Sequence, residues 1–432
     1  MAVGMPGVLD SESADRCMKC GFCMSMCPVY GVDHNESHVA RGRNMLIRMA
    51  RDGGLATDAS YRDSLSACLL CGRCEAVCPA GVPSPAIAVG ARSKMVRERG
   101  LGSSQRLLYR GMVKHRSAFA KLVRGLSWLP GLSNRKGAPV RHFPDVVAAF
   151  FGGMSLPRLS APFLSRRLPQ RIPPREGEIV GQVAVFTGCI FEFFLADAGS
   201  DMLLFLAELG YEVSYPHDQT CCGLPVLSGG DLDTAQAIAK RNIEIFSRYE
   251  HVVTGCASCG GHLKRYESLF GSDDPWKEKA AAFARKVEDF SEFLVKRGHL
   301  APRRREENRR DSESAEKAGG KPRVTYHEAC HIKWKQHVDE AQRKILLGID
   351  DIDFVEMEGA DSCCGLGGYF GIAHPDLRLA MLAKKVDAIR RSGADIVATS
   401  CPGCLLQIMD GLRRENLPVR AMHLAQLVRG GY

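Results

Sequence analysis

The chain has 432 residues, and its 45% hydrophobic and 25% charged content is typical of a soluble globular protein with roughly two to four domains. No apolar run reaches the ~18 residues of a membrane-spanning helix, and the start, MAVGMPGVLDSESADR, lacks the basic and apolar regions of a secretory signal peptide. The formal net charge is +9, but residues 92–136 alone hold twelve Lys or Arg against one acid, so the basic character is local. We therefore expect a cytoplasmic protein rather than a secreted or membrane-spanning one.

Cysteine sets this sequence apart, because it occurs eighteen times and always in groups. A reducing cytosol disfavours disulfides, and a chain of this length needs none to hold its core together. The clustered cysteines are therefore predicted to bind metal.

Residues 1–92 contain eight cysteines in two similar runs, CMKCGFCMSMCP at 17–28 and CLLCGRCEAVCP at 68–79. Both have the spacing C-x2-C-x2-C-x3-C-P of two-cluster ferredoxins, in which three thiolates bind one [4Fe–4S] cluster and the fourth binds the other. Zinc is less favoured, because zinc sites pair two C-x2-C units without a proline-terminated fourth ligand. The predicted ligands are Cys17, Cys20, Cys23 and Cys78 for one cluster, and Cys27, Cys68, Cys71 and Cys74 for the second.

The segment between the two runs is predicted to be helical over residues 41–54 and 61–68, which gives a mainly helical two-cluster ferredoxin domain over 1–92. Arg41 and Arg43 lie in the first of these helices. They could tune the potential of a cluster, but solvated surface arginines are the expectation we favour.

Residues 93–175 contain no cysteine and are predicted to form a basic helical extension followed by a proline-rich linker. An approximate apolar helical face is formed by Leu108, Met112, Phe119, Leu122 and Leu126. A basic amphipathic helix of this kind can lie on an anionic membrane surface. Docking on a partner protein and covering the chain's own core are open alternatives, whereas nucleic-acid binding is disfavoured because no recognised motif accompanies the charge.

Residues 176–300 and 324–432 each alternate between strand-like and helix-like stretches, and the charged segment 301–323 between them is predicted to be a solvated linker. In the first block the predicted strands and helices are 183–190, 201–210, 211–216, 231–249 and 251–255, beginning and ending with a strand. In the second block they are 323–330, 339–347, 353–359, 375–391 and 395–400, in the same alternation. This pattern is typical of βαβ units and predicts two α/β domains with parallel sheets.

The two blocks are copies of one domain, because their cysteines recur at a nearly constant spacing. Cys189 to Cys330 spans 141 residues, Cys221 to Cys363 spans 142, and Cys256 to Cys401 spans 145. Each block carries five cysteines in the order C…CC…C-x2-C. The first pentad is Cys189, Cys221, Cys222, Cys256 and Cys259, and the second pentad is Cys330, Cys363, Cys364, Cys401 and Cys404.

The pentads are predicted to bind metal at the carboxyl ends of their strands, where open α/β sheets gather ligands. Glycines after each CC pair let the chain bend around a bulky group, and helices starting at Cys256 and Cys401 would favour thiolates. Buried structural cysteines, a vicinal disulfide and a four-ligand zinc site each leave part of the repeated pattern unexplained.

The arrangement C…CC…C-x2-C resembles the cysteine-rich CCG domain shared by heterodisulfide reductase and by iron–sulfur subunits of 2-hydroxy-acid oxidases. Two ferredoxin runs followed by two such domains resemble the iron–sulfur subunit of glycolate oxidase, the D subunit of heterodisulfide reductase and the C subunit of anaerobic glycerol-3-phosphate dehydrogenase. RGRNMLIRM after the first run resembles the glycolate oxidase type more than the glycerophosphate type. The resemblance implies two cubane [4Fe–4S] clusters on the ferredoxin cysteines and one noncubane [4Fe–4S] cluster on each pentad.

The resemblance further implies an oxidoreductase component that passes electrons from a flavoprotein partner, acting on glycolate or lactate, to a quinone or another acceptor. No G-x-G-x-x-G follows a predicted strand and no Walker A motif occurs, so the FAD would be held by the partner, and we predict no catalytic residue on this chain.

The rival function is that of a heterodisulfide-reductase-like protein whose noncubane cluster catalyses thiol–disulfide chemistry. In glycolate oxidase iron–sulfur subunits the final C-x2-C is often incomplete, whereas both pentads here are complete. This departure from the glycolate oxidase pattern favours the rival function.

Two histidines flank Cys330 in the sequence YHEACH. His327 and His331 could hydrogen-bond to cluster sulfurs or relay protons. Packing of a strand-end histidine within a loop is at least as strong an expectation.

Overall fold

The computed structural model describes residues 12–106, 109–110, 159–175, 177–300 and 320–432. The apolar face predicted between Leu108 and Leu126, and most of the charged segment 301–323, lie outside these residues. Within the described part of the chain, no helix is both long and apolar enough to cross a membrane.

The N-terminal part, which we call the helical domain, consists of short helices and no strand in residues 12–106. Its elements are η1 Glu12–Arg16, α1 Phe22–Met26, α2 Tyr30–Asp33, η2 Glu36–His38, α3 Ala40–Arg51, α4 Ala59–Ser66, α5 Arg73–Ala76, α6 Ser84–Arg99 and α7 Ser103–Arg106. The helices predicted at 41–54 and 61–68 are confirmed as α3 and α4. The predicted boundary at residue 92 falls inside α6, and the domain boundaries stay a prediction.

The next part, which we call the first repeat, is an α/β domain around a five-stranded sheet. Its strands are β1 Arg171–Ile172, β2 Gly181–Val185, β3 Tyr211–Ser214, β4 Val252–Thr254 and β5 Val287–Asp289. The sheet order is β1-β3-β2-β4-β5, and every pairing is parallel except that of the edge strand β1. The helices are α10 Leu164–Arg167, α11 Gly188–Phe193, α12 Ala196–Glu208, α13 Leu224–Ser228, α14 Leu232–Phe246, α15 Ala257–Leu263, η4 Tyr266–Leu269, α16 Trp276–Ala284 and α17 Phe290–Lys296.

The second repeat, residues 320–432, has the four parallel strands of the first repeat and no counterpart of the edge strand β1 within the described residues. Its strands are β6 Arg323–His327, β7 Asp353–Phe354, β8 Ile396–Thr399 and β9 Arg420–His423. The order β7-β6-β8-β9 is parallel throughout and matches β3-β2-β4-β5, which confirms the duplication and the parallel α/β fold class. The helices are the π turn η5 Ile332–Gln336, α19 Asp339–Leu347, α20 Tyr369–Ala373, α21 Pro375–Ser392, α22 Pro402–Arg414 and α23 Leu424–Val428.

Side-chain caps fix the ends of the helices that lead away from the sheets. Asp289 and His423 each begin a helix after the last strand of their repeat, and each forms a reciprocal capping box with the residue three positions on, Glu292 or Gln426. Helix α21 begins with Pro375, whose missing N–H costs nothing in the first turn. The helix after the last strand therefore begins with the same kind of cap in both repeats.

Several predicted strands are longer than the observed ones. The strands expected at 183–190 and 323–330 end at Val185 and His327, so Cys189 lies inside α11 and Cys330 lies just before η5. The strand expected at 353–359 covers 353–354 alone. Strands β1, β5 and β9 were not predicted, because short edge strands such as VED and RAMH lack an apolar alternation.

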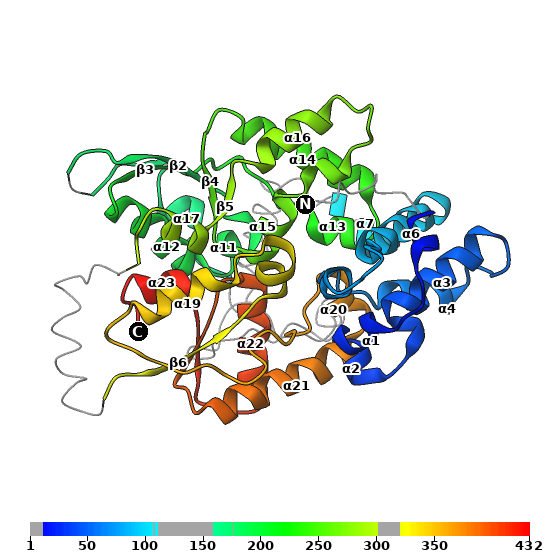
Figure 1. The fold of residues 1–432 in the computed structure, drawn as a ribbon. Coiled ribbons are helices and arrows are strands. Elements are labelled where there is room, and N and C mark those ends of the chain that lie inside the picture. Colours follow the sequence, from blue (N-terminus) through cyan, green and yellow to red (C-terminus); the bar gives the residue numbers. More distant parts are fainter. Residues whose placement is uncertain (1–11, 107–108, 111–158, 176, 301–319) are drawn as a thin grey trace, which may run out of the picture.

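The three parts pack directly on one another (Figure 1). Apolar residues of both repeats share one core, in which the Phe191 ring stands edge-on to His423 at 5.1 Å between centroids. The helical domain is tied on by the buried Arg92, which donates to the carbonyls of Leu65 at 2.6 Å and Cys68 at 2.9 Å, and across the interface to Ser228 at 2.7 Å. This packing brings cysteines of both repeats, together with Leu69 and Leu70 of the helical domain, around one cavity.

Candidate iron–sulfur centres

The two ferredoxin runs have the same backbone conformation at matched positions. Lys19 and Leu70 both have φ near 57°, and the glycines that follow the next cysteine, Gly21 and Gly72, have φ of 91° and 86°. Positive φ is uncommon for side chains larger than glycine. Two loops that share this costly conformation are expected to wrap the same kind of group.

The fourth cysteine of the first run, Cys27, lies near cysteines of the second run. Burial raises the pKa of the Cys74 thiol, and the neighbouring Cys68 and Cys27 add to this rise. Cys78 packs against the same small apolar core as Cys17. The structure thus places Cys27 near Cys68 and Cys74, and Cys78 near Cys17, while the ligand assignment stays a prediction.

Arg43 is buried, so the expectation of a solvated surface arginine was wrong at this position. Its side chain is 2% exposed and donates from Nη1 to the carbonyl of His38. Burial alone lowers the pKa of Arg43, but the thiolates of Cys68 and Cys27 outweigh this and raise it above its ordinary value. Arg41 is partly exposed and pairs with Glu36. A buried cation therefore lies beside the second ferredoxin cysteine group.

The two pentads are built from matching elements of the two repeats. Cys189 and Cys330 follow the matching strands β2 and β6, and the two CC pairs lie in the loops that lead into the short helices α13 and α20. The C-x2-C cysteines begin helices, with Cys256 as the N-cap of α15 and Cys401 as the N-cap of α22. Every pentad cysteine therefore lies beyond the carboxyl end of a strand, as the βαβ pattern predicts.

The glycine after each CC pair has a left-handed backbone. Gly223 and Gly365 have φ of 91° and 92°. Their N–H groups point back at the first thiol of the pair, with N–Sγ distances of 3.5 Å to Cys221 and 3.3 Å to Cys363. The two thiols of each pair stay within hydrogen-bonding reach of one another.

The two pentads face each other across one cavity. This cavity of about 140 Å³ is lined by all five cysteines of the first pentad and by four of the second. The fifth, Cys401, contacts the thiol of Cys256 in the other repeat. An engineered cavity of about 150 Å³ takes up benzene, so the space exceeds what a water molecule needs. The sequence could not show this convergence, because it depends on how the repeats pack.

The donor set fits iron–sulfur clusters. The eighteen cysteines, all within the described residues, form no disulfide. A hydrogen bond from Cys221 lowers the pKa of Cys222 to about 5, and the matching bond from Cys363 lowers the pKa of Cys364. Thiolates are the metal-binding form, and buried thiolates crowded against other sulfurs are unfavourable without a metal to neutralise them.

Polar side chains from the neighbouring repeat reach the second pentad. Ser258 of the first repeat lies with its Oγ 3.4 Å from Cys401 Sγ and 3.5 Å from His331 Nδ1. The same Nδ1 is 3.6 Å from Cys330 Sγ, so His331 is placed for the predicted hydrogen bond to a ligand sulfur. Ser258 was missed because its role depends on the packing of the two repeats.

Comparison with known families agrees with this architecture. A model described as "Cysteine-rich domain", CCG, matches residues 183–264 and 324–409. A model described as "4Fe-4S dicluster domain" matches residues 13–82. The two iron–sulfur modules predicted from the cysteine spacing are thus confirmed.

Three relatives represent the curated proteins that this chain is similar to. The "Probable glycolate oxidase iron-sulfur subunit" of Bacillus subtilis is 32% identical over 434 residues, covering 97% of this chain and 94% of the relative. The B subunit of the fumarate reductase (CoM/CoB) of Methanothermobacter marburgensis is 28% identical over 426 residues, covering 98% of this chain and 73% of the relative. The "Lactate utilization protein A" of Oceanobacillus iheyensis is 32% identical over 249 residues, covering 57% of this chain and 96% of the relative.

The first of these matches extends over nearly the full length of both proteins, and this chain carries the 4Fe-4S dicluster domain followed by two CCG domains. The chain therefore belongs to the family of glycolate-oxidase-type iron–sulfur subunits, oxidoreductase components that combine a 4Fe-4S dicluster domain with two CCG domains.

Proposed function

We propose that this chain is the iron–sulfur electron-transfer subunit of a flavin-dependent dehydrogenase complex that oxidises a 2-hydroxy acid, glycolate or lactate. It accepts electrons from an FAD-containing partner subunit and passes them to a quinone or another acceptor. We place it in the cytoplasm, at the inner face of the cell membrane when the acceptor is a quinone. The names of two relatives, which refer to glycolate oxidase and to lactate utilization, support the substrate class.

The observation that carries the proposal is the continuous series of cysteine groups. Burial raises the pKa of the Cys23 thiol, in the first ferredoxin group, and the nearby Cys27 of the second group adds to this rise. Cys71 of the second group interacts in the same way with Cys330 of the second pentad, and Cys256 and Cys401 join the two pentads. Four redox centres in such a row suit electron transfer and exceed what a sensor or scaffold would need.

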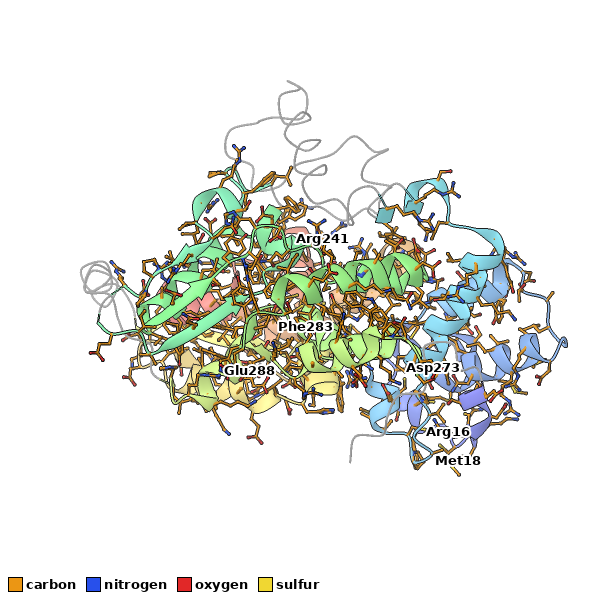
Figure 2. The ribbon with its side chains drawn as sticks, turned by 90° about the horizontal axis from the view of Figure 1, so that it is seen from above. Arg16, Met18, Arg241, Asp273, Phe283 and Glu288 are labelled. Carbon is orange, nitrogen blue, oxygen red and sulfur yellow. The ribbon has the colours of Figure 1, made fainter. Side chains whose placement is uncertain are left out.

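One end of this series reaches the surface of the helical domain. Cys20 is exposed, and Met18 and Phe22 on either side of it are 66% and 61% exposed. Figure 2 shows Met18 at the outer edge of the helical domain, away from Phe283 and Glu288 of the first repeat. Apolar side chains next to a surface redox centre suit a protein partner, and we propose the flavoprotein as that partner.

We propose two cubane clusters in the helical domain and one noncubane [4Fe–4S] cluster on each pentad. The ferredoxin spacing supports the cubane type. Five cysteines per site, one more than a cubane cluster needs, support a different cluster type in the repeats. The protein's own contribution is to fix the order of the centres and to tune them through burial, hydrogen bonds and charge.

The proposal is tested by purifying the chain anaerobically together with its co-purifying partner and adding glycolate, lactate or an unrelated 2-oxo acid. We expect either glycolate or lactate to bleach the visible iron–sulfur absorption of the complex within the time of one turnover. The same acid should not bleach the absorption of the isolated chain. The matched variants Phe22→Glu and Phe283→Leu should separate docking from folding, because Phe22 is exposed and Phe283 is buried. Slower cluster reduction in Phe22→Glu but not in Phe283→Leu supports the proposed docking surface. A complex that neither glycolate nor lactate reduces contradicts the proposed function.

A second candidate function is thiol–disulfide chemistry at the pentads. It is favoured by the completeness of both pentads and by the cavity that they share. A relative whose name cites fumarate together with CoM and CoB also supports it. Reduction or oxidation of the chain by a small thiol or disulfide, at a rate matching turnover and with no response to a 2-hydroxy acid, would favour this second function over the first.

A further inference from the structure

His327 is a buried histidine whose ring nitrogens lack hydrogen-bond partners in the part of the chain that the structure describes. It ends strand β6, its side chain is 1% exposed, and neither Nδ1 nor Nε2 has a hydrogen-bond partner within the described residues. Buried polar groups in native proteins are nearly always satisfied, so an orphaned pair of nitrogens points to a group that the protein atoms do not supply.

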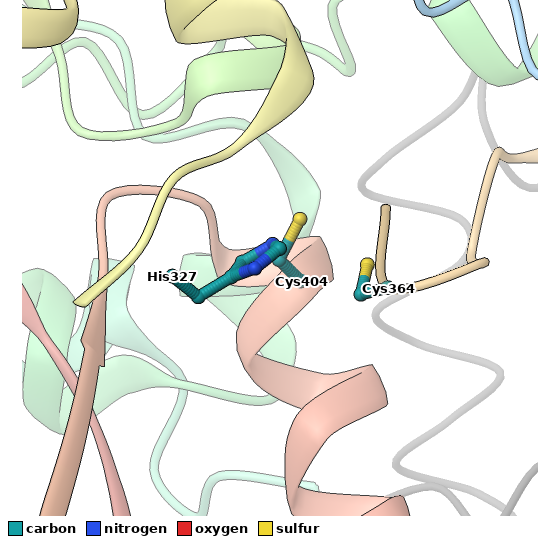
Figure 3. Close-up of side chains that lie close together, drawn as sticks. All are labelled: His327, Cys364 and Cys404. Carbon is teal, nitrogen blue, oxygen red and sulfur yellow. The ribbon is translucent and has the colours of Figure 1, made fainter. Parts of the chain in front are cut away.

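The ring lies within the space where the second pentad gathers its thiols. Each of His327, Cys364 and Cys404 offers a ligand atom, and these three atoms all lie within 4.8 Å of one another. Figure 3 shows the three side chains converging, with His327 coming from the strand end, Cys404 from α22 and Cys364 from the loop before α20. His327 also lines the cavity between the pentads.

The first repeat has no histidine at the matching position. Phe186 precedes Cys189 by three residues, as His327 precedes Cys330. Phe186 directly follows β2, and His327 ends the matching strand β6. Phe186 is fully buried and packs against Phe246 at 5.8 Å between ring centroids. The shared fold therefore tolerates an apolar ring here, which makes a strand-end imidazole a feature of the second repeat alone.

We propose that His327 is an iron ligand of the second CCG centre, a sixth protein donor beside the five cysteines of that pentad. The proposal rests on the assignment of a cluster to the second pentad made above. An imidazole donor satisfies one orphaned nitrogen and adds no negative charge, unlike a further thiolate. Imidazole ligation raises the potential of an iron–sulfur centre relative to all-thiolate ligation, so the second pentad should hold the more readily reduced of the two CCG centres.

The test uses pulsed EPR of the intact, anaerobically purified protein grown with ¹⁵N-labelled histidine and poised where a CCG centre is paramagnetic. We expect one CCG signal to carry a histidine-nitrogen hyperfine coupling of the size seen for directly bound imidazole, and the other CCG signal to carry none. A well-resolved CCG signal without such a coupling overturns the proposal in the wild-type protein, with no dependence on any variant.

Variants then identify the histidine and separate this inference from the proposed function. The coupling should vanish in His327→Phe, which copies the first repeat, and persist in His331→Phe. Loss of the coupling in His331→Phe alone assigns it to the neighbour and overturns the proposal. Both variants should retain the wild-type iron content and melting temperature. Phe186→His, the corresponding change in the first repeat, should leave the iron content and melting temperature unchanged as well. Absence of any CCG signal with about eight irons per chain would overturn the cluster assignment itself, and His327 ligation with it.

Discussion

The two repeats place their cysteines in the same way but surround them with different groups. Both have the same strand order, the same left-handed glycine after the CC pair and the same capped helix after the last strand. Yet Lys385 occupies the position of Asn242, eleven residues after the N-cap of the matching helices α21 and α14. The comparison teaches that the fold fixes where the thiols lie, while single buried side chains set how each site behaves.

The contrast between Lys385 and Asn242 is electrostatic. Asn242 is fully buried, donates to the Cys221 carbonyl at 2.9 Å and accepts from the Thr220 N–H at 3.1 Å. Lys385 is fully buried as well, and its Nζ donates to the carbonyls of Gly359 at 2.8 Å and Ala360 at 3.1 Å. The second pentad therefore faces a cation where the first pentad faces a neutral amide.

The largest effect that separates the repeats should come from removing one ligand in each. Cys222→Ser and Cys364→Ser should each lose about four of about sixteen irons, because each pentad is proposed to hold its own cluster. Iron analysis and EPR of the two variants measure this directly. If either variant loses about eight irons, the pentads share one centre and the comparison of two separate sites fails.

Alanine at the left-handed glycines should destabilise the two repeats unequally. Gly223→Ala and Gly365→Ala both place a Cβ at positive φ, which costs about 1–2 kcal/mol. A Cβ at Gly365 would lie 2.7 Å from the Arg378 carbonyl oxygen, whereas at Gly223 the nearest atom is Ile238 Cγ2 at 3.4 Å. Chemical denaturation should show the larger loss of unfolding free energy for Gly365→Ala; equal losses would mean that the backbone clash relaxes.

Exchanging the buried amide and ammonium should shift the two CCG potentials in opposite directions. Lys385→Asn should lower the potential of the second centre by tens of millivolts, and Asn242→Lys should raise that of the first, because a nearby cation favours the reduced, more negative cluster. A shift of 59 mV in a one-electron couple corresponds to about 1.4 kcal/mol. Redox titration by EPR measures both, with the exposed Lys384→Asn as the matched control. Identical shifts in Lys384→Asn and Lys385→Asn would show that burial of the charge does not matter.

The smallest expected effect concerns the helix caps that follow the last strands. Burial raises the pKa of Asp289 to about 6, from an ordinary value of 3.8. The folded state then binds more protons than the unfolded state in this range, so the contribution of Asp289 to stability falls as the pH rises through 6. Between pH 5 and 7 the loss should be about 1 kcal/mol.

The helix cap of the second repeat, His423, contributes to stability with the opposite pH dependence. Burial lowers the pKa of His423 to about 4, so its contribution to stability rises with pH up to its unfolded pKa of 6.5. Unfolding curves of wild type, Asp289→Asn and His423→Asn at several pH values separate the two contributions. The wild-type slope should become more positive in Asp289→Asn and less positive in His423→Asn; an unchanged slope in both variants would contradict the opposed caps.

The cysteine spacing predicted the two kinds of iron–sulfur module, because the number and order of the cysteines are written directly in the chain. The C-x2-C-x2-C-x3-C-P runs and the repeated pentads specify two kinds of module without knowledge of the fold. The apolar runs before Cys189 and Cys330 predicted the central strands β2 and β6. Strands β5 and β9 escaped prediction, since edge strands of three or four residues carry too little apolar pattern.

The groups that surround the thiols were harder to predict, because their burial depends on packing between distant segments. Arg43 lies in a helix with several other basic residues, so its sequence context suggests a solvated side chain. Lys385 follows an exposed lysine and carries no local sign of its full burial. The convergence of the two pentads on one cavity depends on the packing of one repeat against the other, which no periodicity within a repeat encodes.

The central claim is that each of the four cysteine groups holds its own [4Fe–4S] cluster in a chain built for electron transfer. Iron and acid-labile sulfide analysis of the anaerobically purified, full-length protein tests it most directly. About sixteen irons and a similar amount of sulfide per chain would agree with four clusters. About eight irons, with EPR signals of the cubane type alone, would show that the pentads hold none and would contradict the claim.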